Sequence, residues 1–394
     1  MSAAAEERPT PIRLLQLTAF VSTLDRFAMP PMLVAIAHDL GVPLSQIVTA
    51  AGAYFLVYGL SQPLWGFVSD RLGRVRTMRL TLLVAGILTL SSALAWGPVS
   101  LGITRGLAGG FFGAAYPATL IYLGDTVPAA SRQPFIARLM VGVALGTALA
   151  SVGAGVLADV ATWRAAFVIT GVASLVLSRT LRRLPEPELG RRPLSLAAPL
   201  HEIRRSRITV LVLAFAFTEG AVLLGALTLM PPAIEHTGVS STLAGGVTAI
   251  YGMSVFLSSR LIGRLSAHWH PSRLIAIGGA AAVAGCTLFS ISQSPAMAVG
   301  VAILIGLAWV AMHSSLQTWA TEVLPSARAV VVSLFAGSLF VGSALAALAV
   351  AGLAEAGDYT VIYAAYACAA VPLTLAASWA RSRWQRPSSV VARP

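Results

Sequence analysis

Five ionisable side chains interrupt long apolar stretches of this sequence. Asp25 and Arg26 are adjacent in the first stretch, and Arg105, Glu219 and His313 lie singly in later ones. Carboxyl and imidazole groups bind and release protons, and a guanidinium can hold a nearby carboxylate in its charged form. Because a charge within a membrane costs several kcal/mol, such residues mark functional pathways by default. We therefore expect Asp25, Arg26, Arg105 and Glu219 to be proton-coupling residues.

Each of these residues also has a purely structural interpretation. Asp25 could form a static buried salt bridge with Arg105 or Arg26, although adjacent helical residues project about 100° apart and need not pair with each other. Glu219 could carry the proton, bind a cationic substrate, or remain a protonated carboxyl bonded to a neighbouring helix. His313 can titrate near neutral pH, but a lone histidine among apolar residues is more often a packing residue.

Polar and aromatic side chains also recur one helical turn apart, as on the wall of an internal cavity. Two such stripes occur, one in the second apolar stretch and one in the tenth, each with a spacing of four residues. Packing between helices or a place in the interfacial belt is the alternative for each tyrosine. The predicted cavity residues are Tyr54, Tyr58, Gln62, Tyr116, Tyr251, Trp309, His313 and Gln317.

The elements that must position these residues are apolar helices. The 394 residues are 57% hydrophobic and only 11% charged, with a mean hydropathy of +0.80, whereas soluble domains carry about 25% charged residues. A membrane span needs about 20 apolar residues. The sequence predicts an all-α polytopic membrane protein with twelve transmembrane helices, at 13–38, 47–69, 77–96, 99–123, 137–158, 165–183, 208–231, 241–263, 273–293, 296–320, 329–353 and 359–380.

The basic residues predict how the chain crosses the membrane. All 27 are arginines, and with both termini in the cytoplasm 24 of them lie on that side. Arg164 alone then lies outside, while Arg26 and Arg105 lie within spans. This bias predicts a multi-pass protein of the cell's inner (plasma) membrane with cytoplasmic termini. Arginines confined to short loops form no basic surface, so we expect no nucleic-acid partner despite the net charge of +12.

The chain divides into two similar halves. The longest polar connection, 184–207, separates six spans from six, and a shift of 197 residues pairs Tyr54 with Tyr251 and Gly66 with Gly263. We expect pseudo-symmetric six-helix bundles. The predicted parts are a cytoplasmic tail at 1–12, a bundle at 13–183, a linker at 184–207 with a short surface helix near 198–205, a bundle at 208–381, and a cytoplasmic tail at 382–394.

The loop Gly66-Phe67-Val68-Ser69-Asp70-Arg71-Leu72-Gly73-Arg74-Val75-Arg76 resembles a hallmark of the major facilitator superfamily, Gly-x-x-x-Asp-Arg-x-Gly-Arg. The resemblance implies that this loop latches the two halves at a cytoplasmic gate. The alternative is that its arginines only fix the topology. The gate residues it implies are Gly66, Asp70, Arg71, Gly73 and Arg74.

The segment from Arg105 to Gly113 is similar to the superfamily's fourth-helix signature, an arginine followed by spaced glycines. Many members also carry an Asp-Arg pair in the first helix. The resemblance implies a central cavity, alternating access, and a role for Arg105 in proton or substrate coupling. It implies that the proton gradient drives transport, so we expect no cofactor and no metal; Cys286 and Cys368 lie in apolar runs and form no zinc pattern.

The direction of transport stays open. The chain looks most like twelve-helix drug or metabolite:proton antiporters, which implies efflux of a small, partly apolar molecule in exchange for protons. It keeps their Trp163-Arg164-x-x-Phe167 motif, but Ser151 stands where they have a proline. The alternative is a proton symporter that imports a small organic anion, with Arg26 and Arg105 as its ligands.

A membrane enzyme or receptor is a remote third possibility, since the sequence has no nucleophile cluster, metal spacing or phosphate-binding motif. We therefore expect no enzyme activity. The expected partners are a small-molecule substrate, protons and membrane lipids, and the expected state is a monomer. After the tenth span, Glu322 is expected to pair with Arg328.

Overall fold

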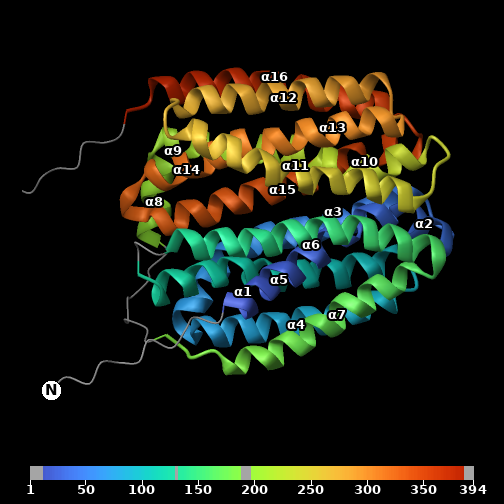
Figure 1. The fold of residues 1–394 in the computed structure, drawn as a ribbon, viewed down its shortest axis with the longest axis horizontal. Helices are drawn as coiled ribbons and strands as arrows, with labels where there is room; N and C mark the ends of the chain where they lie inside the picture. The colour runs from blue at the N-terminus through green and yellow to red at the C-terminus, as the bar shows by residue number, and fades with distance from the viewer. Residues whose placement is uncertain (1–11, 129–131, 188–196, 386–394) are drawn as a thin grey trace, which may run out of the picture.

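The computed structural model describes residues 12–128, 132–187 and 197–385 (Figure 1). These ranges contain helices and turns but no strand, and twelve helical segments in them are long and apolar enough to cross a membrane. The predicted all-α membrane architecture is thereby confirmed. The helices are α1 (Ile12–Ala28), α2 (Leu33–Leu40), α3 (Leu44–Leu72), α4 (Arg74–Ala93), α5 (Pro98–Thr126), α6 (Arg132–Val160), α7 (Trp163–Thr180), α8 (Ala197–Arg205), α9 (Arg207–Glu219), α10 (Gly225–Glu235), α11 (Ser241–Ser266), α12 (Pro271–Ile291), α13 (Pro295–Ala308), α14 (Ser314–Glu322), α15 (Arg328–Glu355) and α16 (Tyr359–Arg383).

Three spans consist of two α-helices joined by a different kind of turn. A 3₁₀ turn at Pro30–Met32 joins α1 to α2, and π turns at Gly220–Leu224 and Trp309–His313 join α9 to α10 and α13 to α14. Every predicted span overlaps one observed segment. The predicted surface helix near 198–205 is α8, while 1–11, 188–196 and 386–394 lie outside the described residues; the predicted C-terminal tail begins within the last turn of α16.

The third span starts earlier than expected, at Arg74 instead of residue 77. The chain turns at Gly73, whose φ of 106° lies in the region that favours glycine. The Glu186 carboxylate, from the connection after α7, then accepts hydrogen bonds from the backbone N–H groups of Val75 and Arg76, both at 3.0 Å. A carboxylate at a helix N-terminus satisfies donors that have no partner within the helix. The helix can therefore begin inside the charged loop.

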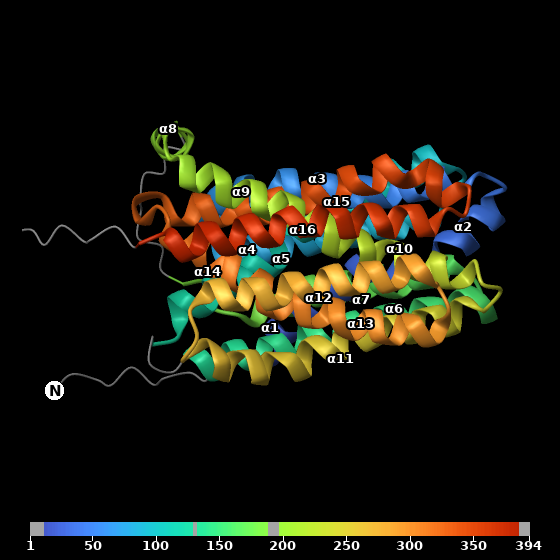
Figure 2. The same cartoon turned by 90° about the horizontal axis from the view of Figure 1, so that it is seen from above.

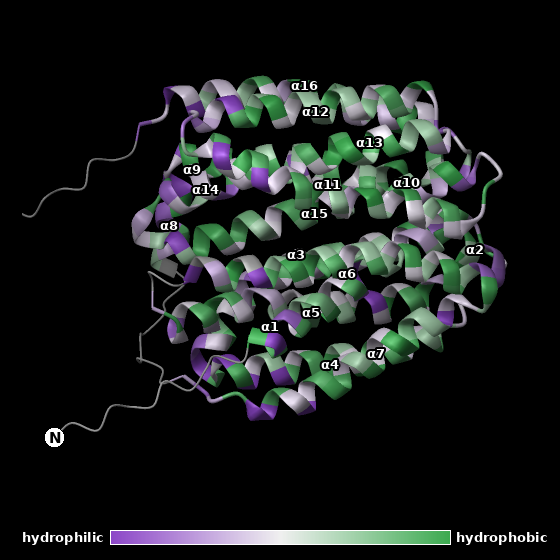
Figure 3. Cartoon of the chain, in the orientation of Figure 1, coloured by the Kyte–Doolittle hydropathy of each residue, from purple (hydrophilic) through white to green (hydrophobic). Residues whose placement is uncertain are grey.

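The helices lie side by side along one direction (Figures 1 and 2), and Figure 1 shows the first six spans in one half of the molecule and the last six in the other. We call the end that carries α8 the linker end, and the opposite end, where α2 stops, the far end. Figure 3 shows hydrophobic residues along the middle of the helices and hydrophilic residues gathered toward the two ends. This is the pattern expected where the middle of each helix faces hydrocarbon.

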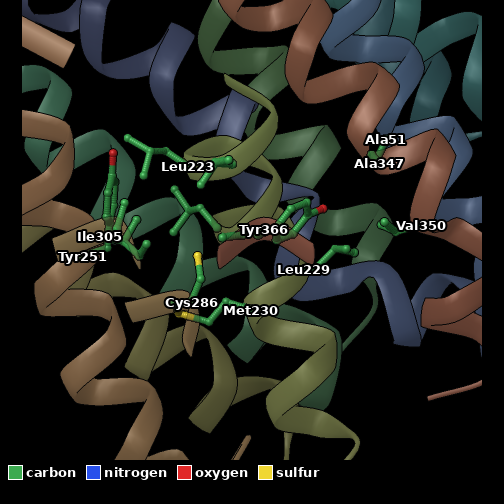
Figure 4. Close-up of a cluster of buried hydrophobic side chains, with 14 of the residues drawn as sticks. Ala51, Leu223, Leu229, Met230, Tyr251, Cys286, Ile305, Ala347, Val350 and Tyr366 are labelled. Atoms are coloured by element: carbon green, nitrogen blue, oxygen red, sulfur yellow. The ribbon is translucent and has the colours of Figure 1, made fainter. Parts of the chain in front are cut away.

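The two halves meet along α3 with α15 and along α6 with α11. Small residues allow the backbones to approach: a Cβ atom on Gly59 would lie 2.7 Å from the carbonyl oxygen of Gly337. One large apolar core fills the second half and continues into the first, and within it Cys286 packs among residues of α10, α11 and α13 (Figure 4). Cys368, in contrast, is exposed on α16.

Candidate functional site

A buried ion pair joins the first and fourth spans. Arg105 donates from Nη1 to Oδ1 of Asp25 at 3.0 Å and from Nη2 to Oδ2 at 2.9 Å, and Nη2 also donates to the backbone carbonyl of Asp25 at 3.2 Å. Thr89 on α4 and Thr170 on α7 donate to Oδ1 at 3.2 and 3.5 Å. Neither charged side chain is more than 1% exposed. Asp25 is thus saturated with donors from three other helices.

Aromatic rings complete the environment of this pair. The Arg105 guanidinium carbon lies 4.6 Å from the ring centroid of Tyr54 and 4.7 Å from that of Phe167. Cations at this distance from aromatic rings are attracted by the ring quadrupole. Tyr54, one of the predicted cavity residues, therefore packs on the ion pair, and it is not among the residues that line the central cavity described below.

Arg26 makes a different set of contacts. Its Nη2 donates to the Tyr58 hydroxyl at 2.6 Å, and its guanidinium carbon lies 4.6 Å from the Tyr58 ring and 5.4 Å from that of Phe340, a residue of the other half. No carboxylate pairs with Arg26 among the described residues, and its buried Nε has no hydrogen-bond partner there. Arg105, and not Arg26, is therefore the cation that holds Asp25.

A second carboxylate contact lies in the other half. Oε2 of Glu219 lies 3.1 Å from Nδ1 of His313, and the Glu219 side chain is fully buried while His313 is 12% exposed. Within the described residues, Oε1 of Glu219 has no hydrogen-bond partner. Trp309 stacks on the imidazole with centroids 4.1 Å apart and ring planes 19° apart. These residues link the seventh and tenth spans.

Both sides of this contact adjoin a π turn. One π turn begins immediately after Glu219, and the other ends at His313. Gly220 opens the first of these turns, and its Cα faces the backbone of Leu339 so closely that no side chain fits between them. Single π turns within α-helices are rare and occur frequently at functional sites.

A cavity of about 290 Å³ lies between the two halves, next to Arg26 and His313. Its residues on the tenth span, from Trp309 to Gln317, lie on the linker-end side of the middle of Pro295–Glu322, and its residues on α6 and α11 lie around and on the linker-end side of the middle of these helices, so the cavity extends from the centre of the bundle toward the linker end. Apolar and aromatic side chains form most of the wall. The lining residues are Arg26, Phe27, Met140, Val143, Ala144, Thr147, Leu224, Tyr251, Gly252, Val255, Phe256, Ser259, Trp309, Val310, His313, Ser314, Gln317 and Phe340.

Four of the predicted cavity residues, Tyr251, Trp309, His313 and Gln317, lie in this lining. The other predicted residues besides Tyr54 lie behind or beside it. Tyr58 reaches the cavity through Arg26, the Gln62 amide donates to the carbonyl of Gly113 at 3.0 Å, and the Tyr116 hydroxyl contacts the sulfur of Met140 at 3.8 Å.

The charged loop after α3 forms its contacts within the first half. Arg74 pairs with Asp70, donates from Nε to Asp125 at 3.0 Å, and donates from Nη1 to Ser69 at 3.1 Å. The Arg71 guanidinium carbon lies 4.0 Å from the Phe67 ring. Across a small pocket lined by Gly66, Phe67 and Asp70, the loop faces the first turns of α15 in the second half. The latch implied by the resemblance remains a prediction.

Two contacts between halves at the far end were not predicted. Asp159, at the end of α6, accepts from the backbone N–H groups of Ser241 and Thr242 at 3.3 and 2.7 Å. Glu355, at the end of α15, accepts from the N–H of Ser45 at 2.9 Å. Each half thus supplies one carboxylate and one helix N-terminus, and we call these contacts the far-end caps. They join the two halves at the far end.

Two further ion pairs join helix ends, one of them in place of a predicted pair. Glu322 pairs with Arg381 on α16 at 3.0 Å, so the predicted pairing with Arg328 is wrong; Glu322 is the last residue of α14, and its side chain reaches the last turn of α16. Arg164 pairs with Asp39, which also accepts from the indole N–H of Trp163 at 3.0 Å. The Trp-Arg motif therefore ties α7 to α2 at the far end.

Comparison with known proteins places this architecture among transporters. The family model described as "Major Facilitator Superfamily" matches residues 15–347 and 234–392. The chain is 31% identical over 164 residues to the 4-hydroxybenzoate transporter PcaK of Acinetobacter baylyi, covering 41% of this chain and 35% of that protein. It is 26% identical over 204 residues to the 3-(3-hydroxy-phenyl)propionate transporter of Escherichia coli, covering 51% and 50%.

The matched stretches span about a third to a half of the length of these curated relatives. Among solved structures, that of a D-xylose-proton symporter superposes with a TM-score of 0.75 at 16% identity, covering 95% of this chain and 97% of that one. At this level of identity the superposition shows a shared fold.

Proposed function

Because this chain belongs to the major facilitator superfamily and is therefore a multi-pass membrane transporter, we propose that it carries a small aromatic carboxylate together with protons. The observation that carries this proposal is Arg26. Its guanidinium lines the cavity without a carboxylate partner among the described residues, and it lies against the rings of Tyr58 and Phe340. The site offers one positive charge within an aromatic wall.

The chemistry of the site supports an aromatic anion. A partly buried guanidinium is stabilised by a carboxylate, which it can bind through two parallel hydrogen bonds. Trp309 and Phe340 add apolar ring surface against which an aromatic substrate can stack. The cavity of about 290 Å³ is at the small end of ligand sites, which run from about 300 to 1,000 Å³. The named substrates of two relatives, 4-hydroxybenzoate and a hydroxyphenylpropionate, have the same chemistry.

Efflux by proton antiport is the second candidate. The observation that favours it is the largely apolar wall, with Phe27, Val255 and Phe256 on one side and the buried Glu219 behind His313 on the other. In an antiporter the proton and the substrate compete for the site, whereas in a symporter each promotes binding of the other. The two candidates therefore differ in the sign of proton–substrate coupling.

We further propose that the linker end is cytoplasmic, with both termini on that side. The cavity then opens toward the cytoplasm while the far-end caps close the outer side. Bundles at 13–183 and 208–381 would move against each other, and the loop with Asp70, Arg71 and Arg74 would close the cytoplasmic end. Among the proposed proton-coupling residues, Arg26 binds the carboxylate, and the pair of Asp25 and Arg105 holds the helix that carries Arg26 in place.

The proposal is tested with the purified protein in proteoliposomes. Labelled 4-hydroxybenzoate should accumulate when the outside is made acidic, and a protonophore should abolish the accumulation; protein-free liposomes measure passive entry of the protonated acid. Arg26→Gln should raise KM more than tenfold, because the substrate loses its counter-charge. Arg264→Gln, an exposed arginine on α11, is the matched control and should change KM little.

Uptake that ignores the pH gradient would refute coupled symport. Export of ethidium in exchange for protons, without transport of 4-hydroxybenzoate, would establish the antiport candidate in its place.

A further inference from the structure

We infer that Glu219 and His313 together bind the transported proton, with His313 facing the cavity and Glu219 sealed behind it, while Asp25 stays ionised in a static pair. This inference rests on the proposed proton-coupled function and assigns the residues that perform the coupling. It distinguishes two buried carboxylates, one in each half, that look equivalent in the sequence.

The hydrogen bonds of the Asp25 carboxylate disfavour its protonation. Both of its carboxylate oxygens accept from Arg105, and Oδ1 also accepts from Thr89 and Thr170. Protonation would leave the Arg105 charge buried without a counter-ion, which is strongly unfavourable. Asp25 is also absent from the cavity lining, so no described path leads a proton to it.

Glu219 can accept a proton, and a proton can reach it from the cavity through His313. Its Oε1 is buried and has no partner among the described residues, while Oε2 contacts Nδ1 of His313. His313 lines the cavity, and its other ring nitrogen makes no hydrogen bond in the described part of the chain. A proton from cavity water can therefore bind Nε2 of His313, and the couple can hold it as an imidazolium beside a carboxylate or as a neutral imidazole beside a carboxylic acid.

The surroundings of the couple link the proton to an anion. Arg26 on α1 and Tyr251 on α11 line the same cavity as His313, and in the described part of the chain they are the other charged and titratable side chains of that lining. Two uncharged rings also lie against His313. Trp309 is on the same span, and Phe335 is on α15 with its ring centroid 5.7 Å from that of the imidazole. The Arg26 cation opposes a further positive charge on His313. A substrate carboxylate bound to Arg26 removes this opposition, so anion and proton promote each other's binding.

The backbone provides an independent indication. Both partners lie next to a π turn, and the helical hydrogen-bond ladder is interrupted at each of these turns. A return of either turn to regular α-helix would shift the register by one residue, about 100° around the helix axis. Such a shift would separate Glu219 from His313, which offers a way to release the proton as the transporter changes state.

The test separates proton coupling from substrate binding. In proteoliposomes, exchange of labelled for unlabelled 4-hydroxybenzoate requires binding and movement but no net proton transfer, whereas accumulation against a gradient requires the proton. Glu219→Gln should retain exchange within about threefold and lose accumulation at least tenfold. His313→Gln should do the same, and it replaces Glu219→Gln if that variant does not fold. Glu202→Gln makes the same amide substitution at an exposed position on α8 and should change neither activity.

A second measurement needs no substrate. Because Trp309 stacks on His313, binding of a proton to the imidazole should quench the fluorescence of Trp309, so the part of the signal that Trp309→Phe removes should depend on pH. Glu219→Gln should move the midpoint by at least one pH unit, and Glu202→Gln should not.

The outcomes are distinguishable. If the wild type shows proton-coupled accumulation and Glu219→Gln accumulates the substrate equally well, the inference is overturned and the proposed function stands. Absence of transport by the wild type would overturn the proposed function, and the fluorescence titration would still decide whether the couple binds a proton. If Glu219→Gln left the pH dependence of the fluorescence unchanged, the inference that Glu219 and His313 bind the proton together would be overturned.

Discussion

Replacing Asp25 by asparagine should destabilise the protein by about 3–5 kcal/mol, the cost of leaving one partner of a buried ion pair uncompensated. The structure gives a similar figure from its hydrogen bonds. Two bonds from Arg105 end on the Asp25 carboxylate, at 2.9 and 3.0 Å. At about 1.5–3 kcal/mol for each bond to a charged group, their loss amounts to about 3–6 kcal/mol. The third bond, to the backbone carbonyl, survives the substitution.

A double-mutant cycle separates the pair from its surroundings. Arg105→Met should also destabilise, because it leaves the Asp25 carboxylate with only Thr89 and Thr170. The double variant has no buried charge at this position. It should therefore lose about 1–3 kcal/mol less than the sum of the two single variants. Asp358→Asn, outside this pair at the start of α16, should stay within about 0.5 kcal/mol of the wild type.

Unfolding can be followed through the reactivity of one thiol. Cys286 is fully buried, and once the exposed Cys368 is replaced by serine, a thiol-reactive dye reports only the loss of the core around Cys286. Denaturation in detergent then yields the free energy of unfolding for each variant. The interpretation of Asp25 and Arg105 as a desolvated, mutually dependent pair would be refuted if either single variant had the same free energy of unfolding as the wild type. It would also be refuted if the double variant lost as much free energy of unfolding as the two single variants together.

The remaining predictions concern helix packing and the far end. Gly220→Ala should destabilise by about 1–3 kcal/mol because its Cβ would enter the backbone of α15, whereas Gly153→Ala, on α6 with open space beside it, should be neutral or slightly stabilising; equal denaturation midpoints would contradict this. Asp159→Asn combined with Glu355→Gln should open the far end, so a cysteine at the buried Ala154, in a background without native cysteines, should react faster with an impermeant maleimide; an unchanged rate would show that the far-end caps do not hold this end closed.

The sequence was sufficient to predict the fold because a membrane helix is specified by the hydropathy of about 20 consecutive residues, and each apolar stretch forms one span. It was also sufficient to find Arg105, Glu219 and His313 as unusual, since a charge or imidazole in such a stretch needs no alignment to be recognised. Three-dimensional pairing was harder. Asp25 has a cation beside it in the chain, Arg26, yet its partner is Arg105, because residues 25 and 26 project from different faces of one helix.

Contacts between distant helices left no local signal. Asp159 and Glu355 look like ordinary carboxylates at the ends of apolar stretches, and their role emerges only when the halves place helix N-termini opposite them. Likewise, nothing in the sequence separated Phe340 from the other apolar residues of its span, although it contributes to the cavity wall. The π turns were equally invisible, since hydropathy does not record a single wider turn.

The far-end caps also bear on how this transporter would respond to the ionic strength of its surroundings. Both carboxylates are exposed, and each faces the positive end of a helix dipole, an attraction that dissolved ions screen. The Debye length is about 8 Å at physiological salt and about 3 Å at 1 M, so added salt weakens both caps while the buried pairs keep their strength. Because each cap joins one half to the other, screening weakens the contact between the halves at that end. Salt at that membrane face would therefore shift the balance between conformations without altering the chemistry of the cavity.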